Sequence, residues 1–255
     1  MDRDARGDRE VSRSRVVGTT HLLDGLWHRL GHAHVLREGF ARVNLPPHWE
    51  RYVFAASAYL ALDHHDDVSL VEWLAYDVDV PGLEPWVRLD GAATALAGAE
   101  LRAVLARHSL EQVDGTVYIG RVGTGHGTVD LAMTPDGTPI RHDTNLAALY
   151  RSRPGRHRVV VVDHAADGQV ADLLVAAVGT AERLYGRTPR RMHPCVGFAQ
   201  LLVHTAETAT GTEWPRIATQ LDRVHRVEFD DGTTALTALN RRQRELFTLC
   251  AVDPP

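Results

Sequence analysis

The middle of the chain changes abruptly from a short apolar run to a longer amphipathic one. Residues Val159 to Val162 are four consecutive β-branched residues, which is typical of a strand buried on both faces. Beyond the breaker Gly168, apolar residues recur at helical spacing between Leu173 and Leu184. The pattern therefore predicts a strand that leads almost directly into an amphipathic helix.

Periodicity predicts further elements on both sides of this unit. Helices are expected over residues 21–30, 48–65, where Pro46 and Pro47 open the helix, and 92–108. Strands are expected over residues 69–81, 116–122, 127–133, 138–143, 198–208, 216–229 and 233–242. The strands at 116–122 and 127–133 are expected to pair, and Pro-Asp-Gly and Asp-Asp-Gly sequences predict turns at 135–137 and 230–232.

The order of these elements predicts an α+β protein with two similar halves. A helix that begins near residue 47 and is followed by strands is echoed by a helix that begins near residue 167 and is also followed by strands. We expect a disordered tail over residues 1–15, a first half over 16–150 and a second half over 151–255. No repeat at the level of individual residues supports this duplication.

Composition limits the classes of function. A net charge of −5 gives no basic footprint for nucleic acid, and no apolar run reaches the roughly 20 residues of a membrane span. The charged N-terminal sequence does not resemble a secretory signal, and only Cys195 and Cys250 are cysteines, so we expect a cytoplasmic protein without a disulfide scaffold. All 28 basic residues are arginine, which excludes Schiff-base and P-loop lysine chemistry.

The junction between the central strand and helix carries the strongest candidate for catalysis. Asp163, His164 and Asp167 stand at the predicted start of the helix, where backbone amides and the helix dipole favour negative charge. His164 could act as an acid or base with a carboxylate to orient it, or Asp167 could simply cap the helix. A third interpretation, the His-x-x-x-Asp-Gly motif of acyltransferases, requires one more residue between His164 and Asp167.

Substrate-binding candidates lie in two loops. His126 stands at the tip of a glycine-rich hairpin, which flanking strands distinguish from a nucleotide-binding loop. The basic residues after the central helix could hold a phosphate or an acidic carrier protein, or form a solvated loop; they are Arg190, Arg191 and His193. Residues 63–67 read Asp-His-His-Asp-Asp, but adjacent side chains seldom converge on one ion, so we expect no metal site.

Several of these residues resemble the AfsA-type proteins, the hotdog-fold family of γ-butyrolactone signal biosynthesis. The family pattern Asp-His-x-x-Asp leading into a helix is matched in register by residues Asp163, His164, Asp167, Leu173, Leu174, Ala177 and Ala181. The resemblance implies tandem hotdog-like halves, each an antiparallel sheet wrapped on a central helix. It also implies a tunnel between them for an acyl-pantetheine arm, with helix amides polarising the thioester carbonyl.

The resemblance thus implies an enzyme that acts on an acyl thioester in bacterial secondary-metabolite or signalling-molecule biosynthesis, by acyl transfer, condensation or dehydration. It requires no cofactor; the substrate would arrive on acyl carrier protein or coenzyme A, and the protein could be a homodimer. Ala176, Gly179 and Thr180 replace the polar residues of the family helix, which favours a non-catalytic acyl-ligand-binding hotdog protein. The other alternative is a cofactor-independent cyclase or isomerase of a different α+β fold.

Overall fold

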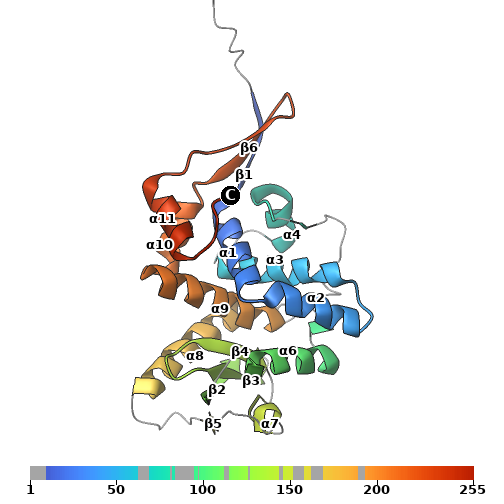
Figure 1. The fold of residues 1–255 in the computed structure, drawn as a ribbon, viewed down its shortest axis with the longest axis vertical. Helices are drawn as coiled ribbons and strands as arrows, with labels where there is room; N and C mark the ends of the chain where they lie inside the picture. Colours follow the sequence, from blue (N-terminus) through green and yellow to red (C-terminus); the bar gives the residue numbers. More distant parts are fainter. Residues whose placement is uncertain are drawn as a thin grey trace, which may run out of the picture.

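A computed structural model shows a mixed α+β protein, as the sequence predicts (Figure 1). It describes residues 10–62, 69–80, 82–83, 95–96, 98–111, 115–125, 127–143, 146–151, 158–161, 169–188 and 193–255. Within these residues the strands form one sheet of three and one of four strands, in the orders β1-β6-β7 and β4-β3-β2-β5. The tandem arrangement of two hotdog halves is not confirmed.

The described elements have the following bounds. The helices are α1 (Gly18–Arg29), α2 (His32–Arg42), the 3₁₀ turn η1 (Pro47–Trp49), α3 (Glu50–Ala61), α4 (Leu70–Glu72), the π-helical turn η2 (Trp73–Asp77), α6 (Ala99–Glu111), α7 (Leu146–Arg151), α8 (Gln169–Arg187), α9 (His193–Thr210), α10 (Trp214–Leu221) and α11 (Arg241–Leu249). The strands are β1 (Val11–Val16), β2 (Thr116–Thr124), β3 (Gly127–Met133), β4 (Pro139–Asp143), β5 (Arg158–Val161), β6 (His225–Phe229) and β7 (Thr234–Leu236).

Helix α3 is the centre of the helical part of the molecule, and every one of its residues is buried. Its sequence is apolar on all sides, so it must be covered all round. Helices α1, α2 and α9 pack against it, and the three form a continuous core with it (Figure 1). This first predicted hotdog helix is therefore covered by helices in the described part of the chain.

Helix α9 supplies much of that cover, and it corrects the prediction of a strand at 198–208. Buried residues along it recur every three or four positions, at Val196, Ala199, Leu202 and Ala206. This is helical spacing, but the short apolar run Leu201-Leu202-Val203 inside it also suits a strand. Packing against α3 selects the helix.

Three other strand predictions need correction. Residues 69–81 begin with a capping box, in which the Ser69 hydroxyl accepts from the Glu72 amide and the Glu72 carboxylate accepts from the Ser69 amide at 3.0 Å, so α4 and η2 form instead. In the segment 216–229, helix α10 runs to Leu221 and the strand begins only at His225. In the segment 233–242, the strand is limited to β7, and an Asn240 capping box starts α11.

The four-stranded sheet follows the sequence more closely. Strands β2 and β3 pair antiparallel from Tyr118–Met133 to Thr124–Gly127, and β4 pairs antiparallel with β3 across the predicted turn. Strand β5 pairs parallel with β2 and forms an edge of the sheet. The prediction that the valine run is buried on both faces was wrong, because an edge strand leaves Val161 48% exposed.

Helix α8 packs against β2, and its predicted apolar stripe is confirmed. Leu174, Val178, Ala181 and Tyr185 are its buried residues. Gly120 of β2 permits this approach, because a Cβ atom there would stand 3.0 Å from the Leu174 side chain. Tyr185 lies on this buried face near the C-terminal end of α8, beside the start of α9.

The smaller sheet lies at the opposite end of the molecule from α8 (Figure 1). Residues 11–15, which belong to the predicted tail, form strand β1 and pair with β6. The predicted turn at 230–232 connects β6 to β7, with Gly232 at a φ of 76°. Residues 1–9 lie outside the described part of the chain, and the predicted boundary between the halves stays a prediction.

Candidate functional site

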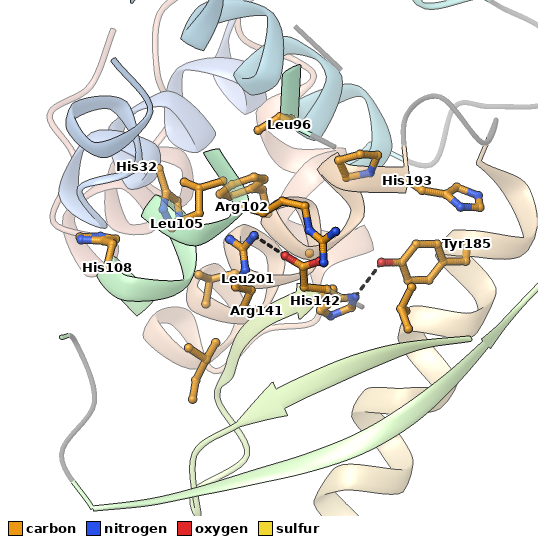
Figure 2. Close-up of a pocket in the computed structure, with 16 residues that line it drawn as sticks. His32, Leu96, Arg102, Leu105, His108, Arg141, His142, Tyr185, His193 and Leu201 are labelled. Carbon is orange, nitrogen blue, oxygen red and sulfur yellow. Dashed lines mark hydrogen bonds and ion pairs between the residues drawn. The ribbon is translucent and has the colours of Figure 1, made fainter. Parts of the chain in front are cut away.

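A cavity of about 330 Å³ lies where the sheet meets the helices. Its walls come from α2, α6, β3, β4, α8 and α9, and Figure 2 shows the side chains that line it. The polar lining side chains are His32, Arg102, His108, Arg141, His142, Asp143, Tyr185 and His193. Apolar side chains lie among them, and they are Leu96, Leu105, Val129, Ile140, Phe198 and Leu201.

Strand β4 brings three consecutive polar residues, Arg141, His142 and Asp143, to this cavity. Among the described strands it pairs with β3 alone, and it also packs against α9. Gly197 of α9 makes this contact possible, because a Cβ atom there would stand 3.2 Å from the Cβ and the backbone nitrogen of His142. The glycine thus fixes the depth at which His142 enters the site.

Two arginines share one carboxylate in the cavity. Arg102 Nη2 lies 2.5 Å from Asp143 Oδ1, and Arg141 Nη2 lies 2.7 Å from Asp143 Oδ2. The Asp143 and Arg141 side chains are only 8% and 10% exposed. Guanidinium groups are also well suited to bind the carboxylate or phosphate of an anionic ligand.

His142 and Tyr185 form a hydrogen-bonded pair at one end of the cavity (Figure 2). The Tyr185 hydroxyl and the His142 Nδ1 atom are 3.3 Å apart. Burial lowers the pKa of His142 to about 4, and Gln200 opposes this shift as a hydrogen-bond acceptor while the positive charge of Arg141 adds to it. Burial also raises the pKa of the Tyr185 hydroxyl, so both side chains are neutral at pH 7.

Gln200 of α9 lies next to His142. Its Nε2 donates to the Ala177 carbonyl of α8 at 3.0 Å, which fixes the carboxamide. Gln200 Oε1 and His142 Nε2 are both buried, and neither has a hydrogen bond of ordinary geometry in the described structure. An N–H on Nε2 would point toward Gln200, and this tautomer leaves Nδ1 free to accept from the Tyr185 hydroxyl.

His32 and His108 lie at the other end of the cavity (Figure 2). The His32 ring packs edge-on against Trp27 and Phe198, with 5.1 Å between ring centroids in each case. Burial lowers the pKa of His32 to about 3, with further contributions from His108 and Arg141. His32 Nε2 and Arg141 Nε are buried without a hydrogen bond from the described residues, so each can serve a ligand.

Of the predicted site residues, the structure describes His193. It lines the cavity, its Nε2 lies 3.1 Å from the Thr188 carbonyl, and its ring meets Tyr185 edge-on at 4.9 Å. Its role in substrate binding stays a prediction. The other predicted site residues lie outside the described residues; they are His126, Asp163, His164, Asp167, Arg190 and Arg191.

The sequence analysis missed most of the cavity. It assigned residues 138–143 to a strand without assigning a role to Arg141, His142 or Asp143. With 15 histidines in the chain, no single one stands out. One feature of the sequence could have indicated a site here: the predicted strand ends in three consecutive polar residues that can carry charge.

The described residues hold no group of three or more His, Cys, Asp or Glu side chains placed to bind a metal ion. Both cysteines are free and buried, and burial raises the pKa of Cys195 to about 12, so it is a thiol at neutral pH. Among the described helices, none combines the length and apolar character that crossing a bilayer requires.

Comparisons of the chain with protein-family models, curated proteins and solved structures found no match. The argument for function therefore rests on the geometry of the cavity.

Proposed function

We propose that the protein is an enzyme that binds a small anionic carbonyl compound in this cavity and transfers a proton on it through Tyr185 and His142. The observation that carries the proposal is the Tyr185–His142 hydrogen bond beside the buried Arg141 guanidinium and the partly exposed Arg102 guanidinium. Arg102 and Arg141 would bind the anionic group, and the apolar lining residues would hold the rest of the substrate.

The pair suits proton transfer because each member can change role. A hydroxyl both donates and accepts, so once His142 Nδ1 carries a proton, Tyr185 can give its own proton to the substrate and take the Nδ1 proton in its place. Alternatively, His142 Nδ1 can receive the Tyr185 proton as the hydroxyl oxygen removes one from the substrate. Gln200 stabilises the ring N–H on the far side, as the third member of a triad orients its base.

An acyl thioester is the substrate class that the resemblance to AfsA-type proteins implies, and it fits this proposal. It offers a polarisable carbonyl, and its pantetheine arm carries phosphate. Helix α8 packs on the four-stranded sheet, but β2, β3 and β4 of that sheet belong to the predicted first half, and β5 pairs parallel with β2, so this packing does not support two separate hotdog halves. Asp163, His164 and Asp167 stay catalytic candidates of the resemblance, and they precede α8 in the sequence, whereas the cavity lies at the C-terminal end of that helix.

The experiment is turnover of acyl and β-ketoacyl thioesters, followed by intact-mass detection of products and retained ligand. Tyr185→Phe and His142→Gln are each expected to lower kcat/KM by about a hundredfold or more. The matched controls are Tyr118→Phe and His204→Gln, half-buried residues outside the cavity lining, and both should retain activity.

Unchanged turnover in Tyr185→Phe would contradict the proposal. Ligand retained without turnover would favour the acyl-ligand-binding alternative. If no thioester reacts but another anionic carbonyl compound isomerises or cyclises with dependence on Tyr185, the cyclase or isomerase class replaces the thioester class.

A further inference from the structure

We propose that the end of the cavity formed by His32, His108 and Arg141 binds a phosphoryl group of the ligand and takes up a proton as it does so. We refer to these three residues as the His32 site. The inference deepens the proposed function by naming a substrate class, and it rests on that function, but its test does not require turnover.

The His32 site joins residues from three separate elements, α2, α6 and β4. His108 lies against the residue before His32, because a Cβ atom on Gly31 would stand 3.7 Å from His108 Nε2. Trp27 and Phe198 hold the His32 ring from two sides, so its orientation is fixed by packing. The site is thus formed before any ligand enters.

Two buried nitrogen atoms at this site have no hydrogen-bond partner among the described residues. His32 Nε2 and Arg141 Nε are buried and make no hydrogen bond with the described residues. Arg141 uses Nη2 for its ion pair with Asp143, which leaves the Nε edge of the guanidinium for a ligand. A phosphoryl group presents three acceptor oxygens and can meet donors from both sides, whereas a carboxylate presents two in one plane.

The charges around His32 favour a doubly charged ligand. Trp27 of α1 and Phe198 of α9 present uncharged rings, while His108 of α6 and Arg141 of β4 present basic groups. The nearby carboxylate, Asp143, already faces Arg102 and Arg141. An anionic ligand at this site would lie beside the Arg141 guanidinium, and a second negative charge on it would be balanced by protonation of a histidine.

His32 is the group expected to take up the proton. Without ligand, burial and its two basic neighbours hold the pKa of His32 at about 3, so the ring is neutral. A dianion beside Nε2 adds an attraction for the protonated ring and raises this pKa. Ligand binding and proton binding therefore strengthen each other.

The test is calorimetric titration of the full chain with inorganic phosphate at pH 6.5, in two buffers with different ionisation enthalpies. At pH 6.5 inorganic phosphate is largely the monoanion and releases a proton when it binds as the dianion, so we compare variants: wild type should take up more protons than His32→Gln, by up to one for each phosphate bound. Acetate should bind at least about tenfold more weakly than phosphate, and His32→Gln should weaken phosphate binding at least about tenfold. The matched control is His34→Gln on the same helix, where the side chain is 75% exposed, and it should behave as wild type.

Arg141→Lys provides a second variant that keeps the positive charge and loses the Nε donor, and it should also weaken phosphate binding. Phosphate binding with the same proton balance, or with equal affinity, in His32→Gln and wild type would overturn the inference. Tyr185→Phe should bind phosphate normally. Unchanged turnover in Tyr185→Phe together with His32-dependent phosphate binding would count against the proposed function alone, and Tyr185-dependent turnover without phosphate binding would count against the His32 site alone.

Discussion

Two buried ionic clusters in this molecule differ in how completely the protein satisfies them. The first surrounds Glu50 at the start of α3, and the second surrounds Asp143 at the end of β4. Both place a carboxylate between two arginines, in the first case Arg37 and Arg51. The first cluster joins helices, whereas the second lines the cavity.

In the Glu50 cluster the acceptors and donors are matched. The fully buried Glu50 carboxylate accepts from Trp27 Nε1 at 2.5 Å, from Arg37 Nε at 3.1 Å and from Arg51 Nε at 3.1 Å. Arg51 also donates to Asp24 at 2.5 Å. The pocket described above does not reach these side chains, so the cluster serves to join α1, α2 and α3.

In the Asp143 cluster and its neighbours, buried polar atoms lack partners. His32 Nε2 and Arg141 Nε make no hydrogen bond with the described residues, and both side chains line one cavity. Buried polar groups are normally satisfied, because each one left unsatisfied costs roughly 1–3 kcal/mol. The Glu50 cluster shows that this protein can provide hydrogen-bond partners for the polar atoms of a buried cluster. The polar atoms left without partners in the cavity are therefore available to a ligand.

The largest expected effect is a difference in how much each cluster contributes to the stability of the fold. Glu50→Gln should lower the free energy of unfolding by about 3–5 kcal/mol, because it removes the charge at the centre of a fully buried network and leaves the buried Arg51 guanidinium with Asp24 alone. Asp143→Asn should cost less, since the Asp143 side chain is 8% exposed and lies at a cavity, whereas Glu50 is fully buried. Urea denaturation measures both, with Glu38→Gln as the control in an exposed ion pair, expected to change stability by less than about 1 kcal/mol. An equal loss of stability in the Glu50 and Asp143 variants would contradict the difference between the two clusters.

Acidification should destabilise the protein through the cavity. Both His32 and His142 have a folded pKa below their ordinary value of 6.5, so the unfolded chain binds more protons below that pH. Stability is therefore complete above pH 6.5 and falls as the pH decreases toward about 4 for His142 and about 3 for His32, by at most roughly 1.4 kcal/mol per pH unit for each residue. Urea denaturation at pH 7.5, 6 and 5 measures the slope.

His32→Gln and His142→Gln should each reduce that slope, and the double variant should reduce it most. A slope that remains the same in the double variant would show that neither histidine is responsible. His34→Gln is the matched control, because its exposed ring sits outside the cavity.

A smaller effect is expected from two glycines in helices. Gly197→Ala forces α9 and β4 apart at His142 and should cost about 1–3 kcal/mol, with a loss of ligand binding in the cavity. Gly186→Ala in α8 meets no atom within 4 Å and should instead stabilise the protein by roughly 0.5–1 kcal/mol. Thermal unfolding of the two variants gives the sign of each change, and a stabilising Gly197→Ala would contradict the close contact.

The sequence predicted elements whose pattern is local and long. The predicted stripe from Leu173 to Leu184 is helical over several turns, and a glycine-rich turn separates β2 from β3. Helix α9 was predicted as a strand because its strongest apolar run is short enough for one. Its packing against α3, which the sequence does not show, favours the helix.

The candidate site depends on contacts that no local pattern contains. His32 and Arg141 meet in space although more than a hundred residues separate them in the sequence, and Gly197 is recognisable as a spacer only once β4 lies against it. The sequence analysis selected the start of α8, whereas the described cavity lies at its other end, where Tyr185 and His193 meet.

The most direct test of the central claim measures the thermal stability of the wild type and of two matched arginine variants with anionic carbonyl compounds and phosphate. Arg141→Gln alters the cavity, and Arg37→Gln alters the Glu50 cluster. A ligand at a hundred times its Kd should stabilise by about 2.7 kcal/mol, which raises Tm by roughly 2–4 °C for each kcal/mol. The account predicts this rise in the wild type and in Arg37→Gln, and its loss in Arg141→Gln; an equal rise in all three proteins, or none in the wild type, would contradict it.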